Sequence, residues 1–212
     1  QAGIRLAKLD EAGLPGQTKA LREILTEAER LVLDTETDQP LRLDAIEALG
    51  HGSELHGNTA AVFQKLLAPS ETSAVRHGTI RAVGNMTAAG AAKLLLAAWS
   101  GLVANERASA LDVLLSRGTW QEALLQGMES GQVSINGFSL VHRDRLLKSA
   151  NKAVAKRARG VFANEAEGDR AGALAKFAPA LKLGGDAEKG WLVYDMHCAV
   201  CHAPDKQLGP DL

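Results

Sequence analysis

Two cysteines and a histidine stand out because their types and spacing point to one specific chemistry. Cys198 and Cys201 are the only cysteines among the 212 residues, and His202 follows directly. Two thiols three positions apart can add across the two vinyl groups of a porphyrin, and the next residue's imidazole can bind the iron. The spacing therefore predicts covalent attachment of one haem c, with Cys198 and Cys201 as thioethers and His202 as the proximal iron ligand.

Three other uses of these residues are less well supported. A thioredoxin-type redox pair needs a βαβ setting, and the residues before Cys198 do not read as a strand that ends at a helix. A zinc site could add His197 to the motif, but Cys-x-x-Cys supplies half of a structural zinc site and the sequence holds no second half. A plain disulfide between Cys198 and Cys201 stays open if haem is never attached.

A helix that runs into the motif would position these residues. Gly190, Tyr194 and Cys198 are four residues apart, which aligns them along one stripe of a helix. Asp186 is placed to cap the start of this helix, where a carboxylate suits the positive end of the helix. We expect Gly190 to allow a close helix crossing and Tyr194 to supply an apolar surface beside the porphyrin.

Residues 184–212 resemble the opening half of a class I cytochrome c domain. The resemblance rests on Gly-x3-Tyr-x3-Cys-x2-Cys-His followed by Gly209 and Pro210. It implies that Pro210 lies against the haem and fixes the proximal histidine through its carbonyl oxygen.

This resemblance stops short of a whole cytochrome c domain. Such a domain continues to a second axial ligand, usually a methionine, and to a C-terminal helix. Neither is present, because the last methionine, Met196, lies on the same expected helix as Cys198. The sequence also begins with Gln1. We therefore expect a fragment of a longer protein, cut within or just after the first part of its haem domain.

The rest of the sequence predicts an all-α fold. It is 46% hydrophobic and 23% charged, and apolar residues recur at helical spacing along most of it. A net charge of −1 offers no basis for binding nucleic acid. No apolar run approaches the roughly 18 residues of a membrane helix, so we expect no membrane span.

Three segments align at offsets of 34 and 31 residues. They share an arginine, an apolar residue four positions later and another three positions beyond: Arg42, Ile46 and Leu49; Arg76, Ile80 and Val83; Arg107, Leu111 and Leu114. A second amphipathic helix is expected after each segment, around residues 61–67, 88–99 and 120–128. Ser70 and Thr87 are the expected N-caps, and Pro40 is expected to open a helix.

Helix pairs of this kind cannot bury their apolar stripes alone, so they stack into a continuous core. We expect an α-solenoid of helix pairs over residues 1–183, and its pattern resembles HEAT or armadillo repeats. An incomplete cytochrome c-like segment is expected over residues 184–212.

The order of these two parts resembles the C-terminal part of large planctomycete and verrucomicrobial haem-binding proteins. The resemblance covers roughly residue 41 onward. In that family a β-propeller similar to sugar dehydrogenases commonly precedes the repeats. The resemblance implies a periplasmic or otherwise extracytoplasmic location, and a dehydrogenase domain or partner protein as the electron donor.

For the other conspicuous residues we expect structural roles. Trp99, Trp120 and Trp191 are interpreted as packing residues, although Trp191 could instead face the junction between the two domains. The scattered histidines are not expected to form a separate metal site. The basic run after residue 147 is interpreted as a solvated helix face that could receive an acidic partner: Lys148, Lys152, Lys156, Arg157 and Arg159.

Together these features predict an electron-transfer module, a helical-repeat scaffold that carries the start of a covalent haem domain. The sequence gives no persuasive catalytic constellation, so any dehydrogenase activity would belong to other domains or a partner. The alternative is a haem-free helical-repeat scaffold for protein–protein interaction.

Overall fold

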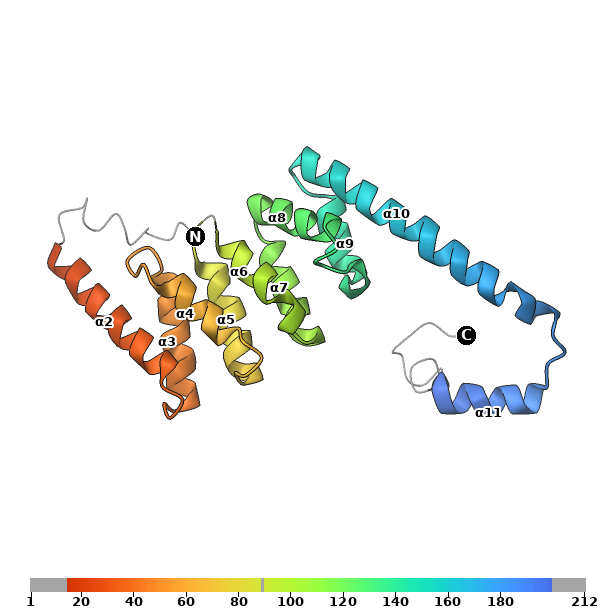
Figure 1. Ribbon diagram of the computed structural model, residues 1–212, viewed down its shortest axis with the longest axis horizontal. Helices are drawn as coiled ribbons and strands as arrows, with labels where there is room; N and C mark the ends of the chain where they lie inside the picture. Colours follow the sequence, from red (N-terminus) through yellow and green to blue (C-terminus); the bar gives the residue numbers. More distant parts are fainter. Residues whose placement is uncertain (1–14, 89, 200–212) are drawn as a thin grey trace. The chain divides into compact units, whose positions relative to one another are not determined.

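The computed structural model describes residues 15–88 and 90–199, and every regular element among them is helical. This confirms the all-α prediction. The elements in chain order are α2 (Pro15–Leu33), α3 (Gln39–His51), α4 (Thr59–Leu66), α5 (Ser73–Asn85), α6 (Ala91–Ala98), η1 (Trp99–Gly101), α7 (Ala104–Leu114), α8 (Gly118–Glu129), η2 (Ile135–Gly137), α9 (Leu140–Leu147), α10 (Lys152–Phe177), η3 (Ala178–Lys182) and α11 (Ala187–His197). Figure 1 follows this order.

The chain divides into two compact units within α10, between Glu165 and Ala166. The predicted domain boundary at residues 183 and 184 falls between η3 and α11. The assignment of residues 184–212 to a haem domain stays a prediction.

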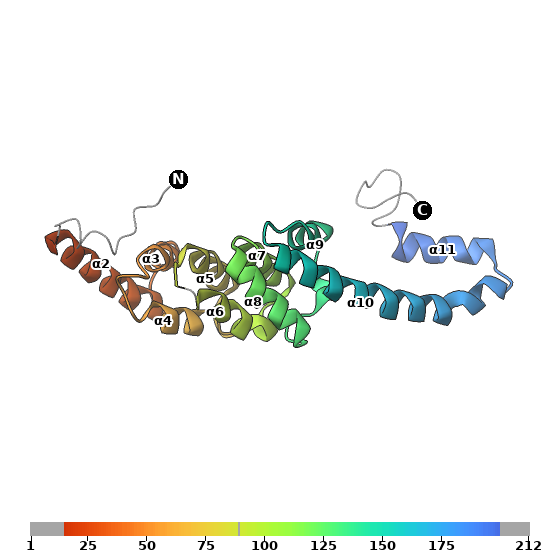
Figure 2. The ribbon, with the colours of Figure 1, turned by 90° about the horizontal axis from the view of Figure 1, so that it is seen from above.

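In the first unit the helices form two rows. Helices α3, α5 and α7 pack side by side in one row, while α4, α6 and α8 form the other (Figure 2). Side chains from both rows meet in one hydrophobic cluster that extends from Leu25 to Phe162. The six aligned apolar residues at the second and third pattern positions are all fully buried in this cluster: Ile46, Leu49, Ile80, Val83, Leu111 and Leu114.

The three aligned arginines make equivalent contacts. Arg42 Nε donates to the Val32 carbonyl at 2.8 Å, and Arg76 Nη1 donates to the Pro69 carbonyl at 3.2 Å. Arg107 Nε donates in the same way to the carbonyl of Trp99 at 3.2 Å. Each acceptor lies at or just beyond the end of the preceding α-helix, where carbonyls lack the i+4 amide partner of a helix interior. The repeated arginine thus satisfies the end of one helix from the start of the next.

Further side-chain bonds join residues about one repeat apart. Arg117 donates from Nη1 to the Met86 carbonyl at 2.6 Å and from Nη2 to the Gly84 carbonyl at 2.7 Å. Gln132 Nε2 donates to the Leu96 carbonyl at 2.8 Å. These bonds fix the position of each helix against its neighbour in the next repeat.

Two of the expected helix caps are wrong. The N-cap of α5 is Thr72, whose hydroxyl accepts from the Val75 amide at 3.4 Å, rather than Ser70. The N-cap of α6 is Gly90, and the hydroxyl of Thr87 instead donates to Glu54. Thr87 therefore joins the connection between α5 and α6 to the connection between α3 and α4. Pro40 lies at the start of α3 as expected.

The second unit contains the end of α10, then η3 and α11. Large apolar side chains on all three elements are exposed: Leu174, Phe177, Leu181, Leu183, Trp191, Leu192, Val193 and Met196. None of the described helices is long and apolar enough to cross a membrane.

Candidate functional site

Helix α11 extends from its N-cap, Asp186, to its C-cap, Cys198, the first cysteine of the Cys-x-x-Cys-His motif. Asp186 caps its start, because the Lys189 amide donates to Asp186 Oδ1 at 3.2 Å. This bond, together with the Lys189 side chain 3.1 Å from the same carboxylate, lowers the pKa of Asp186. The capping prediction is confirmed.

The other end of α11 delivers the first cysteine of the motif. Cys198 is the C-cap residue, and its amide donates to the Tyr194 carbonyl at 2.8 Å. Tyr194 and Cys198 therefore lie one turn apart, as the four-residue spacing predicts. Both side chains are partly exposed. Cys201, His202 and Pro210 lie outside the described residues, so their predicted roles stay predictions.

Trp191 is part of this candidate site, although it was expected to be a packing residue. Its ring stacks on that of Tyr194, with centroids 5.3 Å apart and planes 28° from parallel. Trp191 is 65% exposed, so it is not a core residue like Trp99 and Trp120, which are buried as expected. The signal for Trp191 was its spacing, because residues 191, 194 and 198 follow the i, i+3, i+7 rule of one helix face.

Helix α11 is apolar on two faces. Trp191 and Tyr194 lie on the side of Cys198, while Leu192 and Met196 lie about half a turn away on the opposite side and are exposed. Exposed apolar surface is typical of places where another protein surface packs, so both faces are candidate contact surfaces.

The described residues fit one edge of a porphyrin. A flat pair of aromatic rings beside Cys198 provides the apolar contact that a haem needs next to its thioether bond. A Cβ placed on Gly190 would meet no other atom within 4 Å, so none of the described helices makes the close crossing that was expected at Gly190. The chemistry of the donor set, a thiol followed by the Cys-His pair of the motif, suits the same group.

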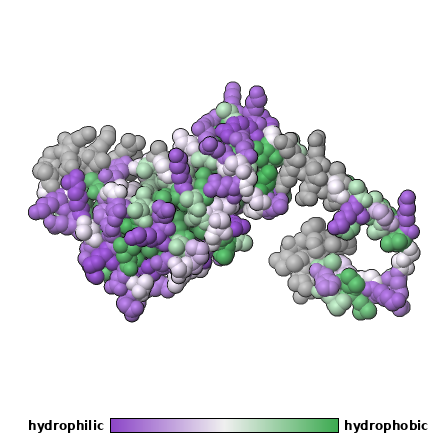
Figure 3. Space-filling view, in the orientation of Figure 1, coloured by the Kyte–Doolittle hydropathy of each residue, from purple (hydrophilic) through white to green (hydrophobic). Residues whose placement is uncertain are grey.

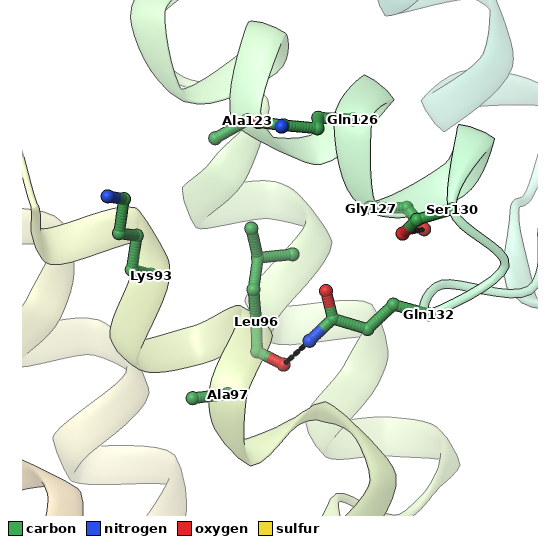
Figure 4. Close-up of a pocket in the computed structure, with 8 residues that line it drawn as sticks. All are labelled: Lys93, Leu96, Ala97, Ala123, Gln126, Gly127, Ser130 and Gln132. Atoms are coloured by element: carbon green, nitrogen blue, oxygen red, sulfur yellow. Dashed lines mark hydrogen bonds between the residues drawn. The ribbon is translucent and has the colours of Figure 1, made fainter.

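The first unit offers a second kind of candidate site, two grooves between second-row helices. One groove of about 350 Å³ lies between α6 and α8, where Leu96, Ala97 and Gly127 form part of its lining (Figure 4). A second groove of about 250 Å³ lies between α4 and α6 and shares Ala97. Ser130 lines one groove and Ser100 the other, but neither groove is lined by a histidine, a cysteine or a carboxylate, so both suit a bound chain segment better than catalysis.

The two grooves are related by one repeat. Gln64, Ala97 and Gln126 hold equivalent positions, because each directly follows a buried apolar pair on its helix. Gln64 and Ala97 line the groove between α4 and α6, while Ala97 and Gln126 line the groove between α6 and α8. The second row thus presents similar hollows in succession.

The described histidines of the first unit make separate contacts. His56 Nε2 lies 2.5 Å from Glu29 Oε2, His77 Nδ1 donates to the Ser73 carbonyl at 3.0 Å, and His142 Nε2 lies 3.5 Å from Asp112 Oδ1. The contact of His56 joins the connection after α3 to α2, that of His142 joins α9 to α7, and that of His77 lies within α5.

Comparison of the chain with models of known protein families, with curated proteins and with solved structures finds no match.

Proposed function

We propose that this chain is an electron-transfer module that binds one haem c covalently. Cys198 and Cys201 would form the thioether bonds, His202 would be the proximal iron ligand, and Pro210 would orient His202. Tyr194 and Trp191 would lie against the porphyrin. When bound, the haem supplies one-electron redox chemistry at its iron.

One observation carries this proposal: a capped helix ends at the first cysteine of the motif, with a stacked aromatic pair beside it. An exposed Trp191 ring stacked on a partly exposed Tyr194 ring would be unusual on a helix that served only as a solvated linker. The second apolar face, with Leu192 and Met196, would contact the remainder of a haem domain.

The wider assignment follows from the same motif and from the repeats. We propose HEAT-like repeats stacked as an α-solenoid, and membership of the planctomycete and verrucomicrobial haem-binding proteins. The equivalent bonds of Arg42, Arg76 and Arg107 support a true structural repeat. A dehydrogenase domain or a partner dehydrogenase would supply the electrons, in a periplasmic or other extracytoplasmic compartment.

Production in a host with the c-type maturation system tests the proposal directly. The chain and the full-length gene product should give a pyridine haemochrome spectrum of c type, and the haem should stay attached in a denaturing gel. The double variant Cys198→Ser/Cys201→Ser is the control and should lose the attached haem. Absence of covalent haem from both native proteins would overturn the proposal.

A second candidate function is a haem-free scaffold for protein–protein interaction, and the successive grooves favour it. Ala97 lines both grooves, so a photo-crosslinking amino acid at position 97 should capture a segment of the partner in cells. The same amino acid at the exposed position 20, on α2, is the control. Equal capture at both positions would contradict a groove-bound partner.

A further inference from the structure

We propose that the free face of the first part of α10 is a docking surface for an acidic patch on a partner protein. This part of the chain has an unusual charge. Residues 145–164 include six arginines and lysines and no aspartate or glutamate. Because the whole chain carries a net charge of −1, six positive charges here leave −7 for the remainder. Positive charge is thus concentrated in a short stretch of a slightly acidic protein.

Half of these cations are neutralised within the first unit. Arg145 pairs with Asp112 at 2.9 Å, and Lys148 pairs with Asp144 at 2.8 Å. Arg157 pairs with Glu129 at 2.7 Å. The hydrogen bond from Arg157 lowers the pKa of Glu129, which favours the ionised carboxylate that pairs with Arg157.

The other three cations make no ion pair with any described residue. Lys152, Lys156 and Arg159 are exposed, and their spacing of four and three residues places them on one side of α10. The opposite side of the helix is buried, with Val154, Ala158 and Phe162 in the core. We call Lys152, Lys156 and Arg159 the basic stripe. Figure 3 shows hydrophilic side chains gathered at the top of the view, where α10 begins.

The basic stripe is unfavourable for the isolated chain. Like charges one helical turn apart repel and lower the stability of a helix. Elsewhere in the first unit arginines of the repeats find carboxylates, as Arg42 does with Glu71 at 2.7 Å and Arg76 with Glu106 at 2.9 Å. A partner that brings carboxylates to the stripe would remove the repulsion and speed association through electrostatic steering.

The chemistry of this face favours a protein partner over a membrane. Between residues 152 and 163, the exposed residues beside the stripe are Arg157 and three small residues, Ala153, Gly160 and Ala163. A helix that binds a bilayer surface inserts large apolar side chains into it, and residues 152–163 expose none. Small neighbours instead let the surface of another protein approach the cations closely.

The size and surroundings of the stripe also favour a protein over nucleic acid. The stripe extends about 10 Å along the helix, which is close to the screening length in physiological salt. An acidic patch on a protein has this size. A nucleic acid or a bilayer carries an extended negative field that would also meet the remainder of the chain, whose net charge is −7.

Binding of a fluorescent oligoglutamate peptide, followed by anisotropy at increasing salt, tests the proposal and does not require haem. The wild-type chain should bind the peptide, and affinity should fall as salt rises. The triple variant Lys152→Glu/Lys156→Glu/Arg159→Glu should bind roughly tenfold or more weakly. Circular dichroism of the variant should show an unchanged helical fold.

The matched control is Lys65→Glu/Arg81→Glu/Lys182→Glu. These three cations are also exposed and lack an ion pair with any described residue, and the variant has the same net charge as the stripe variant. Its affinity should stay within about twofold of wild type. Equal losses in both variants would show a net-charge effect and overturn the proposal. Tighter binding of phosphatidylserine vesicles or of duplex DNA than of the peptide would overturn the choice of a protein partner.

Discussion

Arg76 Nε donates a hydrogen bond to Glu106 Oε1 at 2.9 Å and so joins α5 to α7. Glu106 is completely buried. Its carboxylate also accepts from the Ser73 hydroxyl at 3.1 Å and from the Val103 amide at 3.0 Å. Because both oxygens have donors, the cost of burying the charge is offset within the contact.

Replacement of Glu106 by glutamine should destabilise the chain strongly. Arg76 would keep its charge in a partly buried place without a counter-charge. The NH2 group of the new glutamine would also face hydrogen-bond donors that the Glu106 carboxylate accepts from. We expect a loss of about 3 kcal/mol in the free energy of unfolding, measured by urea denaturation. Glu47→Gln is the control, since the Glu47 side chain is 71% exposed, and it should change stability little. Similar losses in both variants would contradict the buried-pair explanation.

The same carboxylate should make stability depend on pH. Burial alone would raise the pKa of Glu106, but hydrogen bonds from the Val103 amide, Arg76 and Ser73 together lower it below its usual 4.5. Since the pKa is lower in the folded than in the unfolded chain, the stabilisation is complete above the unfolded value and is lost as pH falls through the folded value.

We therefore expect the difference in urea midpoint between wild type and Glu106→Gln to be largest near neutral pH. It should shrink as pH falls below about 4.5. Other carboxylates titrate equally in both proteins and cancel in this difference. A difference that stays constant down to acid pH would show that the charge of Glu106 does not contribute.

Two glycine substitutions should act in opposite directions. A Cβ on Gly50 would lie 2.6 Å from the Ala82 carbonyl oxygen, so Gly50→Ala should force α3 away from α5. We expect a loss of about 2 kcal/mol. A Cβ on Gly160 would meet nothing within 4 Å, and Gly160→Ala should stabilise α10 by about 0.5 kcal/mol. Thermal unfolding by circular dichroism measures both stability changes. A Gly50→Ala variant that is stabilised, as Gly160→Ala is expected to be, would contradict the close contact between α3 and α5.

The bridge made by Arg117 should depend on its guanidinium group. The group donates to the Gly84 carbonyl in the last turn of α5 and to the carbonyl of Met86, the C-cap of α5. Its central carbon lies 4.3 Å from the centroid of the Trp120 ring. A lysine cannot reproduce the planar fork, so Arg117→Lys should cost about 1.5 kcal/mol. Arg81→Lys, at an exposed position, is the control. A loss no larger than that of the control in urea denaturation would show that charge alone suffices.

Single-cysteine variants should separate the two thioether bonds of the proposed site. In a host with c-type maturation, Cys198→Ser should keep haem through Cys201 alone, with one vinyl group left unreacted. The pyridine haemochrome band should then lie between those of haem c and haem b. An unchanged band position would contradict a bond at Cys198, and Ser70→Ala, at an exposed position, is a suitable neutral control.

The sequence could predict features that depend on residues close together in the chain. Helical spacing placed Ile46, Ile80 and Leu111 in the core, and all three are fully buried. Asp186 could be identified as a cap because a cap bonds to an amide only three residues away. By contrast, Ser70 was wrong as a cap because the choice among nearby polar residues depends on the turn before α5.

The sequence by itself thus determined the all-α fold, the buried positions of the aligned helices and the Cys-x-x-Cys-His motif, since each depends on local spacing. Only the tertiary structure decided which partners lie about thirty residues away, such as Glu106 for Arg76, or Gly84 and Met86 for Arg117. It also decided that Lys152, Lys156 and Arg159 lack such partners among the described residues. Ion pairs between helices depend on how the helices pack, and spacing along one helix does not specify that packing.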